Sequence, residues 1–210
     1  EVHPIHEQAR NFYALCTGID AKNIVEFGTG HGGSALVLAA AANYSGGRLI
    51  SVDPGTNNLQ FIANNMRYWG LSNNWTPHLG EDSLSFRKIY REKYNDRPID
   101  VLFIDSGHTY SDTKYEIEVW EPLVRKGGII LFHDIVWDFH SVQQAVDEFL
   151  DERRGVYITP SFKRQCSGCD AINSRPLLDD NRRPDRQSPE TFDAPASTLD
   201  KSFNDYDFKN

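Results

Sequence analysis

The chain has 210 residues, a formal net charge of -8 and a composition of 39% hydrophobic and 25% charged residues, which is typical of a globular protein with one buried core. Its longest apolar run, residues 34–42, is far shorter than the roughly 20 residues that a membrane-spanning helix needs. The negative charge argues against the broad basic face that binds nucleic acid. We therefore expect neither a membrane nor a nucleic acid as a partner, and we take the cytoplasm as the default location.

Along the first 155 residues, short apolar runs alternate with longer segments of helical periodicity, which is the pattern of a parallel sheet with crossover helices. In chain order, strands are expected at residues 23–28, 48–53, 75–80, 100–105 and 128–134. Helices are expected at residues 7–19, 33–44, 58–70, 83–94, 111–128 and 141–155. The helix at 111–128 should begin at a Ser111 cap and stop at the pair Gly127 and Gly128.

Two more short strands, at residues 156–162 and 169–174, are expected to form a hairpin. The predicted fold class is therefore α/β: a doubly wound, mostly parallel, seven-stranded Rossmann-like sheet with a C-terminal antiparallel hairpin. Residues 1–22 are expected to form an N-terminal helical segment, for which a role as a lid over the site is one hypothesis. Residues 23–175 are expected to form the ligand-binding catalytic domain. Residues 176–210 are rich in Pro, Asp, Ser and Asn, and this polar, acidic tail is expected to be either disordered or docked.

The stretch VEFGTGHGGSAL, residues 25–36, carries the first chemical signal, because an apolar strand runs through four glycines into a helix. Gly28, Gly30 and Gly33 match the G-x-G-x-x-G fingerprint of dinucleotide-binding loops. Asp53 ends the next strand, where a carboxylate can accept hydrogen bonds from ribose hydroxyls. This context indicates a ligand that carries adenosine, with ordinary tight turns as the structural alternative.

Glu26, two residues before the first glycine, narrows the choice of ligand. A carboxylate at this position would repel a pyrophosphate on the following helix and would accept a hydrogen bond from an amino group. This favours S-adenosylmethionine over NAD.

With these residues the chain resembles the class I S-adenosylmethionine-dependent methyltransferases. Their first motif, E-x-G-x-G-x-G, is similar to VEFGTGHGG, while ISVDPG and LGEDS are similar to the second and third motifs, which supply a ribose-binding acid and an acid near the adenine amino group. FIDSGHTY and RKGGIILFHD extend the resemblance over residues 24–175. The resemblance implies S-adenosylmethionine as cofactor, bound by Glu26, Gly28, Gly30, Gly32, Asp53, Asp82 and Asp105.

Within that superfamily, residues 105–134 most resemble the small-domain group of macrolide-sugar (macrocin-type) and cephalosporin-tailoring O-methyltransferases. This resemblance implies that Asp105 and Asp134 bind a divalent cation and that His108 is the base toward a sugar or phenolic hydroxyl, with Asp105 also catalytic. His133 stands where several relatives have Glu, so the expected metal set is Asp105, His133 and Asp134. Such a softer set suits manganese, iron or zinc at least as well as magnesium.

The chemistry of methyl transfer supports the same assignment. The reaction is an in-line displacement at a sulfonium, so the enzyme has to align a nucleophile and remove its proton. Asp105, His108, His133 and Asp134 should meet at the carboxyl ends of the strands, opposite the glycine loop. For three of them a structural role stays open: a capped turn for Asp105, a loop contact for His108 and a core position for His133.

The predicted function is metal-assisted O-methylation of a small hydroxylated acceptor: a sugar, a phenol or a natural-product scaffold. The alternatives are a metal-independent N- or O-methyltransferase, an NAD-dependent oxidoreductase and a non-catalytic cofactor-binding partner module. The small core leaves the acceptor pocket either open or closed by a second subunit in a homo-oligomer. Weaker candidates are His31 and His140, the segments around His3, His6, Trp137 and Phe139, and the pair Cys166 and Cys169, which we interpret as turn residues with a disulfide or zinc still open.

Overall fold

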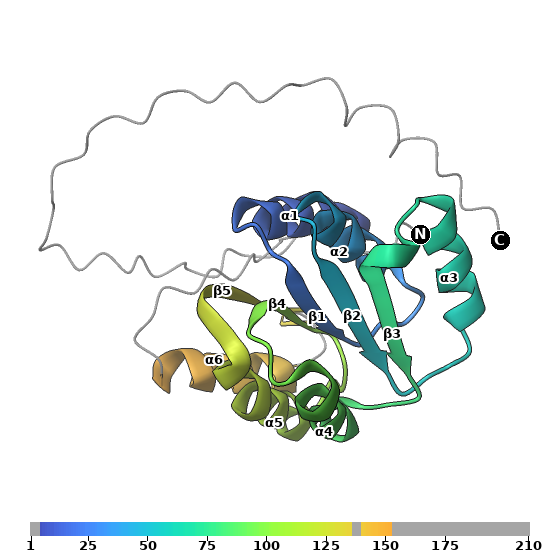
Figure 1. The fold of residues 1–210 in the computed structure, drawn as a ribbon. Coiled ribbons are helices and arrows are strands. Elements are labelled where there is room, and N and C mark those ends of the chain that lie inside the picture. The colour runs from blue at the N-terminus through green and yellow to red at the C-terminus, as the bar shows by residue number, and fades with distance from the viewer. Residues whose placement is uncertain (1–4, 136–139, 153–210) are drawn as a thin grey trace, which may run out of the picture. The chain divides into compact units, whose positions relative to one another are not determined.

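A parallel five-stranded sheet forms the centre of the computed structural model, which describes residues 5–135 and 140–152 (Figure 1). The strand order is β3-β2-β1-β4-β5, and every pair is parallel. The strands are β1 (Asn23–Phe27), β2 (Arg48–Asp53), β3 (Trp75–Leu79), β4 (Ile99–Ile104) and β5 (Val124–Phe132). The helices are α1 (Ile5–Gly18), α2 (Gly33–Tyr44), α3 (Leu59–Tyr68), α4 (Ser83–Tyr94), α5 (Tyr110–Trp120) and α6 (His140–Glu152), with short 3-10 turns η1 (Ser72–Asn74) and η2 (Glu121–Leu123).

Helices cover both faces of the sheet, because successive side chains of each buried strand point to opposite faces. In β1, Ile24 packs in the cluster on the side of α1, α2 and α3, whereas Val25 and Phe27 pack in the cluster on the side of α4, α5 and α6. All five residues of β1 are buried. The two layers are visible above and below the sheet in Figure 1. A strand that is apolar on both faces is the reason for the continuous hydrophobic runs in the sequence.

The predicted helix at 111–128 is wrong at both ends. Its first turn is capped by Thr109, whose hydroxyl accepts from the N–H of Asp112 at 3.1 Å. The helix ends at Trp120, because Pro122 lacks an N–H and disfavours helical continuation, and the chain passes through η2 into β5. Gly127 and Gly128 lie inside β5 rather than at a helix end, beside the register shift between β4 and β5.

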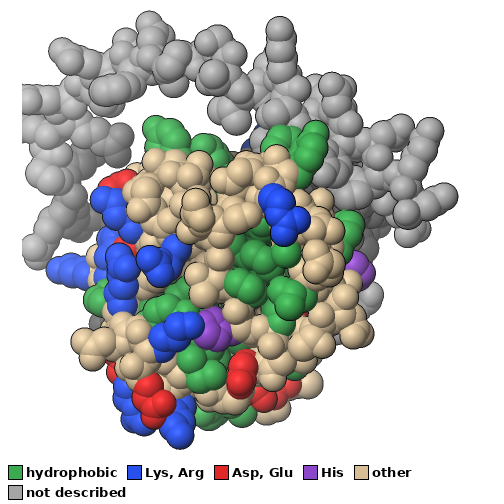
Figure 2. Space-filling model, turned by 45° about the vertical axis from the view of Figure 1, so that its right-hand side comes forward, with side chains coloured by type: hydrophobic (Ala, Val, Ile, Leu, Met, Phe, Trp, Pro, Cys, Tyr) green, Lys and Arg blue, Asp and Glu red, His purple; other side chains and the backbone are tan. Residues whose placement is uncertain are grey.

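Five of the seven expected strands are thus present, and the remaining two, with their hairpin and the acidic tail, fall outside the described residues. In the described part of the chain, β3 borders the sheet, and its middle residue Pro77 pairs with Ser51 of β2. The described helices include none that is long and apolar enough to cross a membrane. On the α3 side, large hydrophobic side chains such as Phe61 and Tyr68 are exposed, and hydrophobic groups gather at the middle of the face in Figure 2.

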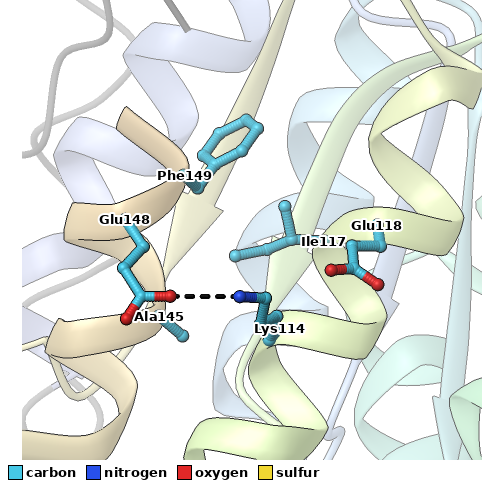
Figure 3. A pocket seen from close by; sticks show the side chains of 6 residues that line it. All are labelled: Lys114, Ile117, Glu118, Ala145, Glu148 and Phe149. Carbon is cyan, nitrogen blue, oxygen red and sulfur yellow. Dashed lines mark hydrogen bonds and ion pairs between the residues drawn. The ribbon is translucent and has the colours of Figure 1, made fainter. Parts of the chain in front are cut away.

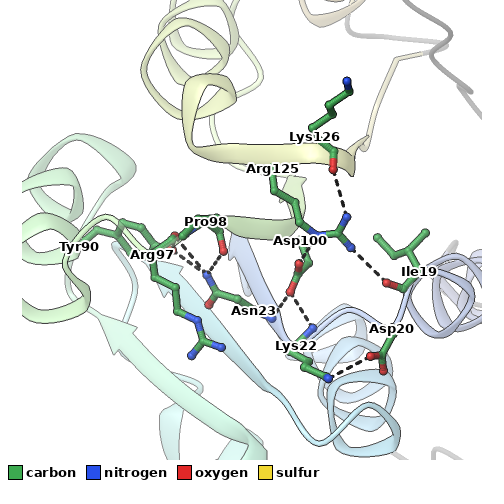
Figure 4. Close-up of polar contacts among 10 residues, drawn as sticks. All are labelled: Ile19, Asp20, Lys22, Asn23, Tyr90, Arg97, Pro98, Asp100, Arg125 and Lys126. Atoms are coloured by element: carbon green, nitrogen blue, oxygen red, sulfur yellow. Dashed lines mark hydrogen bonds and ion pairs between the residues drawn. The ribbon is translucent and has the colours of Figure 1, made fainter.

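At the start of β4, Asp100 links the beginnings of three strands (Figure 4). Its Oδ2 accepts from the backbone N–H groups of Lys22 at 2.8 Å and Asn23 at 2.7 Å, and its Oδ1 accepts from the guanidinium of Arg125. Arg125 also donates to the carbonyl of Ile19 at 3.1 Å. Although burial acts in the opposite direction, Arg125 and the two N–H groups lower the pKa of Asp100. This network fixes the turn between α1 and β1 against β4 and β5.

Candidate functional site

The glycine loop between β1 and α2 lies directly against the loop that follows β4. Gly28 has a φ of +87°, and a Cβ at this position would overlap the backbone carbonyl of Asp105. The N–H of Asp105 donates to the carbonyl of Phe27 at 2.8 Å, and the N–H of Gly28 donates to that of Val52 at 2.9 Å. Glycine is therefore required here by both backbone conformation and contact. The contact places the predicted cofactor loop beside the predicted catalytic residues.

The other two motif glycines differ in their surroundings. Gly32 has a φ of +86°, and a Cβ there would lie 2.7 Å from the Ile62 side chain of α3, so this glycine permits close packing. Gly30 has a φ of +51°, and a Cβ there would meet nothing within 4 Å. The loop is thus closely packed at Gly28 and at Gly32, whereas the position between them, Gly30, has free space beside its backbone.

Asp53, at the end of β2, holds the first half of the glycine loop. Its Oδ2 accepts from the N–H groups of Thr29 at 2.8 Å and Gly30 at 2.9 Å, and its Oδ1 accepts from Gly55 at 2.7 Å. Asn58 adds a hydrogen bond to the carbonyl of Gly30 at 2.9 Å. The structure therefore brings Asp53 to the loop, while its predicted contact with ribose stays a prediction.

Glu26 is fully buried at the end of β1. Its Oε1 accepts from the hydroxyl of Ser34 at 2.5 Å and its Oε2 from the hydroxyl of Ser51 at 2.7 Å, while Trp75 Nε1 donates to Ser51 at 3.1 Å. Burial raises the pKa of Glu26 to about 7, although both serine hydroxyls act to lower it. The predicted contact with an amino group of a ligand stays a prediction.

Asp82 caps α4 at the same edge of the sheet. Its Oδ1 accepts from the N–H of Ser85 at 2.7 Å, and Ser85 accepts from the N–H of Asp82 at 3.1 Å, which is a reciprocal capping box. The hydrogen bond from the Ser85 N–H lowers the pKa of Asp82. The side chain is exposed, and its predicted place near adenine stays a prediction.

The four predicted acids and histidines after β4 and β5 form one cluster. His108 Nε2 lies 3.1 Å from Asp134 Oδ2 and 3.9 Å from Asp105 Oδ1. His133 Nδ1 lies 3.0 Å from Asp134 Oδ1 and 3.2 Å from Asp105 Oδ1. The side chains of the two aspartates are about one quarter exposed, whereas that of His108 is 41% exposed. The cluster is therefore half-buried and open to a ligand on the His108 side.

His133 faces the carboxylates rather than acting as a core histidine. The backbone N–H of His133 donates to the carbonyl of Ile104 at 3.0 Å. The imidazole ring packs edge-on against the ring of Phe103, with 6.5 Å between the ring centroids. Asp105 and then Asp134 raise the pKa of His133 to about 10, and His133 in turn lowers the pKa of Asp134. Its Nδ1 is at ion-pair distance from both carboxylates, although neither contact has the direction of a good hydrogen bond. The imidazole is thus held protonated between two acids.

A set of three side chains, Asp105, His108 and Asp134, offers ligand atoms that all lie within 4.8 Å of one another. Two carboxylate oxygens and one imidazole nitrogen fit a divalent transition-metal ion. This set contains His108 where the sequence predicted His133, so both histidines are within reach of the two acids. Metal binding stays a prediction, and so does the choice of His133 as the imidazole ligand.

A methyltransferase domain family matches residues 25–135, which span the glycine loop and the acid and histidine cluster. The chain belongs to this family. The expected enzyme class, a methyltransferase, is thereby confirmed. The narrower grouping with macrolide-sugar and cephalosporin-tailoring enzymes stays a prediction.

Solved structures resemble the fold of this methyltransferase. An O-methyltransferase from Bacillus cereus in complex with SAH shares 24% identity over 72% of this chain and 70% of that chain, with a TM-score of 0.60. The O-methyltransferase TomG from Streptomyces achromogenes, involved in tomaymycin synthesis and in complex with SAM, shares 22% identity over 70% and 69%, with a TM-score of 0.59. A methyltransferase from Geobacter sulfurreducens shares 19% identity over 70% and 69%, with a TM-score of 0.54. No curated protein sequence matches the chain. These likenesses confirm the Rossmann-like α/β fold.

Several partners of the site in this methyltransferase were not identified from the sequence. Ser141 of α6 donates to the carbonyl of His108 at 2.9 Å, and Ser106 donates to both oxygens of Glu116 at 2.6 Å. Glu116 is buried, which raises its pKa. Serines carry no periodic signal, and their acceptors lie on other elements, so no local pattern could have found them.

The remaining candidates lie away from the cluster or outside the description. His31 and His140 are exposed and are not part of the cation-ligand set. Helix α1 packs on α2 through buried Phe12 and Cys16, and a lid role for this segment stays a prediction. The side chain of His6 falls outside the described residues, and so do five further candidates: His3, Trp137, Phe139, Cys166 and Cys169.

A small hollow on the outer side of the molecule lies between α5 and α6 (Figure 3). Its lining consists of Lys114, Ile117, Glu118, Ala145, Glu148 and Phe149. Lys114 Nζ lies 3.1 Å from Glu148 Oε2 across it. None of the predicted site residues lines this hollow, so it is separate from the strand-end cluster.

Proposed function

We propose that this methyltransferase transfers a methyl group from S-adenosylmethionine to a hydroxyl oxygen of a small acceptor: a sugar, a phenol or a natural-product scaffold. The observation that carries the proposal is the direct contact between the glycine loop and the loop that bears the acids and histidines, at Gly28 and Asp105. A methyl donor on the first loop and a proton acceptor on the second would lie side by side, as a displacement at a sulfonium requires.

The charges at the strand ends support a cationic donor. Glu26, Asp53 and Asp105 end or follow β1, β2 and β4, and the latter two carboxylates act coulombically on Glu26. Such a group of acids attracts a sulfonium and repels a pyrophosphate, which disfavours NAD. The Bacillus cereus and Streptomyces achromogenes relatives were solved with SAH and SAM. In the proposal, Gly28, Gly30 and Gly32 admit the donor, Asp53 accepts from its ribose and Asp82 lies near its adenine.

His108 is the proposed general base. Its side chain is 41% exposed, and Asp134, with Oδ2 3.1 Å from Nε2, would stabilise the imidazolium that forms when the acceptor hydroxyl loses its proton. Ser141 fixes the His108 carbonyl and so restrains the loop that carries this imidazole. Asp105 supports the same proton transfer through its negative charge at 3.9 Å.

The residues around His108 also fit a divalent cation, which would be held by Asp105, Asp134 and His133. A bound divalent cation lowers the pKa of a hydroxyl that it contacts. His133 must first lose the proton that the two acids hold at a pKa of about 10, so metal binding would release a proton and strengthen with rising pH. With His133 as ligand, His108 is not needed to hold the cation and keeps its proposed role as base.

A second candidate, metal-independent methyl transfer, is favoured by the protonation of His133. An imidazolium between Asp105 and Asp134 already neutralises part of their charge without a metal ion. His108 would then act alone on a phenol or an amine. A cytoplasmic location and a homo-oligomer that closes the acceptor pocket remain further proposals.

The test is the production of S-adenosylhomocysteine from S-adenosylmethionine with a panel of sugar and phenol acceptors, with and without a chelator. We expect His108→Gln to turn over about a hundredfold more slowly than the unmodified protein. We also expect a chelator to abolish turnover by the unmodified protein. Exposed Glu118 of α5 supplies the control Glu118→Gln, which should keep full activity. Turnover that persists in chelator would favour the metal-independent candidate. In calorimetry, binding of NAD but not of S-adenosylmethionine would refute the proposed donor.

A further inference from the structure

Glu116 is a buried carboxylate of α5 that the proposed chemistry does not use. The residue is 3% exposed, and its two oxygens both accept from the hydroxyl of Ser106 at 2.6 Å. Burial raises the pKa of Glu116, whereas side-chain hydrogen bonds from Ser106 and from Ser83 act to lower it. A carboxylate that leaves water costs free energy unless hydrogen bonds compensate for it, and these two serines supply such bonds. Glu116 therefore connects α5 with the loop after β4 and with the start of α4.

Each of the two serines directly follows an acid of the predicted site. Ser106 follows Asp105, the aspartate that lies beside both imidazoles. Ser83 is the buried first residue of α4 and follows Asp82, the acid predicted to lie near adenine. The carboxylate of Glu116 thus lies behind two segments whose neighbouring side chains belong to opposite sides of the predicted site.

Ser106 also lies at the contact between the two loops of the site. A Cβ on Gly28 would come within 3.1 Å of the backbone nitrogen of Ser106, next to its overlap with the carbonyl of Asp105. Because Ser106 and Asp105 are adjacent in the chain, a displaced serine would move the carboxylate after β4. It would also move the surface on which the glycine loop packs.

The other side-chain contacts between α5 and this loop are longer or lie at the surface. Thr109 accepts from the exposed N–H of Asp112 at 3.1 Å. The hydroxyl of Thr113 lies 3.5 Å from the carbonyl of Gly107, which is the limit for a hydrogen bond. Glu116, by comparison, offers charged acceptor oxygens from inside the protein, where water does not compete and such a bond is stronger. We therefore expect Glu116 to contribute most to the position of this loop.

We propose that Glu116 is a positioning residue that holds the donor side and the base side of the site in a fixed relation to each other. It acts through Ser83 at the start of α4 and through Ser106 in the loop that carries Asp105 and His108. In this role Glu116 touches neither the donor nor the acceptor. The inference rests on the proposed function, since the two sides are those of the proposed methyl transfer. A merely structural role would lower stability and leave the activity of each folded molecule unchanged.

The test first removes the two connections one at a time. We compare kcat with the most active acceptor of the sugar and phenol panel and the calorimetric affinity for S-adenosylhomocysteine. Ser106→Ala should lower kcat about tenfold and weaken the affinity by a smaller factor. Ser83→Ala should show the reverse, with an affinity about tenfold weaker and a smaller change in kcat. Ser45→Ala is the matched control, because this buried serine at the end of α2 makes no side-chain hydrogen bond within the described structure.

Variants of Glu116 itself should combine the two effects. Glu116→Leu removes the acceptor of both serines, so it should lower kcat and weaken S-adenosylhomocysteine binding together. Glu116→Gln keeps an acceptor oxygen and should restore most of both properties. Glu118→Leu, the same substitution at an exposed position of α5, is the control and should change neither. Adding Ser106→Ala to Glu116→Leu should lower kcat no further, because both changes break the same contact.

Hydrogen exchange of the protein without ligand gives a third readout. The backbone amides of residues 105–109 should exchange faster in Glu116→Leu and in Ser106→Ala. If the unmodified protein is active, unchanged kcat and unchanged binding in Glu116→Leu would overturn the inference alone, even if the variant is less stable. If Glu116→Leu does not fold, unchanged kcat in Ser106→Ala together with unchanged binding in Ser83→Ala would overturn it. If the unmodified protein neither binds nor produces S-adenosylhomocysteine, the proposed function fails and the inference fails with it.

Discussion

Strand β4 carries an aspartate at each end, and the two differ in their partners. Asp100, its second residue, accepts from two backbone N–H groups and a guanidinium, none of which titrates near neutral pH. Asp105, directly after the strand, has the imidazoles of His108 and His133 as its nearest charged partners. The same residue type therefore has backbone and guanidinium donors at the start of the strand and two imidazoles beside it at the end, where we propose the catalytic site.

The largest loss of stability and of donor binding is expected at Gly28, where the glycine loop contacts the backbone of Asp105. Gly28→Ala places a Cβ on the Asp105 carbonyl in a left-handed backbone conformation, which should cost at least about 3 kcal/mol of stability and abolish donor binding. Thermal unfolding followed by circular dichroism measures the loss. Gly30→Ala is the control, because its Cβ meets nothing within 4 Å and only the strain of about 1 kcal/mol remains. Equal losses in both variants would contradict the importance of the Asp105 contact.

Asp105→Asn tests the functional end of β4. We expect activity to fall about a hundredfold or more, because the variant loses a negative charge beside both imidazoles. The unfolding temperature should also fall in the pH range where His133 is protonated, because Asp105 contributes most to the raised pKa of that imidazole. Rates of S-adenosylhomocysteine production, compared with those of Glu118→Gln, provide the measurement. Full activity in Asp105→Asn would remove this residue from the proposed site.

Asp100→Asn tests the structural end of the same strand. The amide oxygen can replace only one carboxylate oxygen, so either Arg125 or both N–H groups of Lys22 and Asn23 would lose their acceptor, which should cost about 2 kcal/mol in urea unfolding. Activity per folded molecule should be retained, because the network lies where β1, β4 and β5 begin, whereas the cluster follows the carboxyl ends of β4 and β5. A variant that is stable but inactive would reverse the comparison.

The pH dependence of stability distinguishes the two ends further. The folded-state pKa of His133 is raised from 6.5 to about 10, so its stabilising contribution is complete below about pH 6.5 and is lost as the pH rises toward 10. His133→Gln should therefore lose less stability than the unmodified protein between pH 6.5 and pH 10. Unfolding temperatures across this range give the answer, and parallel curves would show that the imidazolium does not stabilise the fold.

The smallest loss of stability is expected for Glu148→Gln. Glu148 has fixed partners, as Asp100 does, but its side chain is partly exposed to solvent. Glu148 accepts from Lys114 at 3.1 Å (Figure 3). It also accepts from Tyr110 at 2.6 Å, and its side chain is 39% exposed. Solvent screens such a pair, so the unfolding temperature should fall by less than about 2 °C. A fall as large as that of Asp100→Asn would show that fixed partners matter more than burial.

The sequence predicted the strands and the meeting of the chemical residues because both follow from local pattern and sheet topology. Apolar runs located β1, β2 and β4 to within a residue or two, and the glycine spacing located the loop that contacts Asp105. Since parallel strands end at one edge, Asp105, His108 and Asp134 were expected together, and the structure brings them within 4.8 Å. These features need no knowledge of side-chain orientation.

What the sequence did not predict depends on contacts between distant residues or on a neglected local rule. Glu26 and Ser51 are 25 positions apart, and only the register of β1 and β2 brings them together. The orientation of His133 depends likewise on its pairing with Ile104. The end of α5, by contrast, was readable: Pro122 in EPL is a stronger stop than the later glycine pair, which instead accommodates the irregular pairing of β4 with β5.

Pro77 at the centre of β3 has a consequence for the behaviour of the protein at high concentration. An exposed strand edge is a template on which further chains can add by backbone hydrogen bonding, and such addition leads to aggregation. In the described part of the chain β3 is a border strand of five residues, and its middle residue has no N–H to offer. An incoming strand would find the row of donors interrupted, so this edge is a poor nucleus for fibril growth.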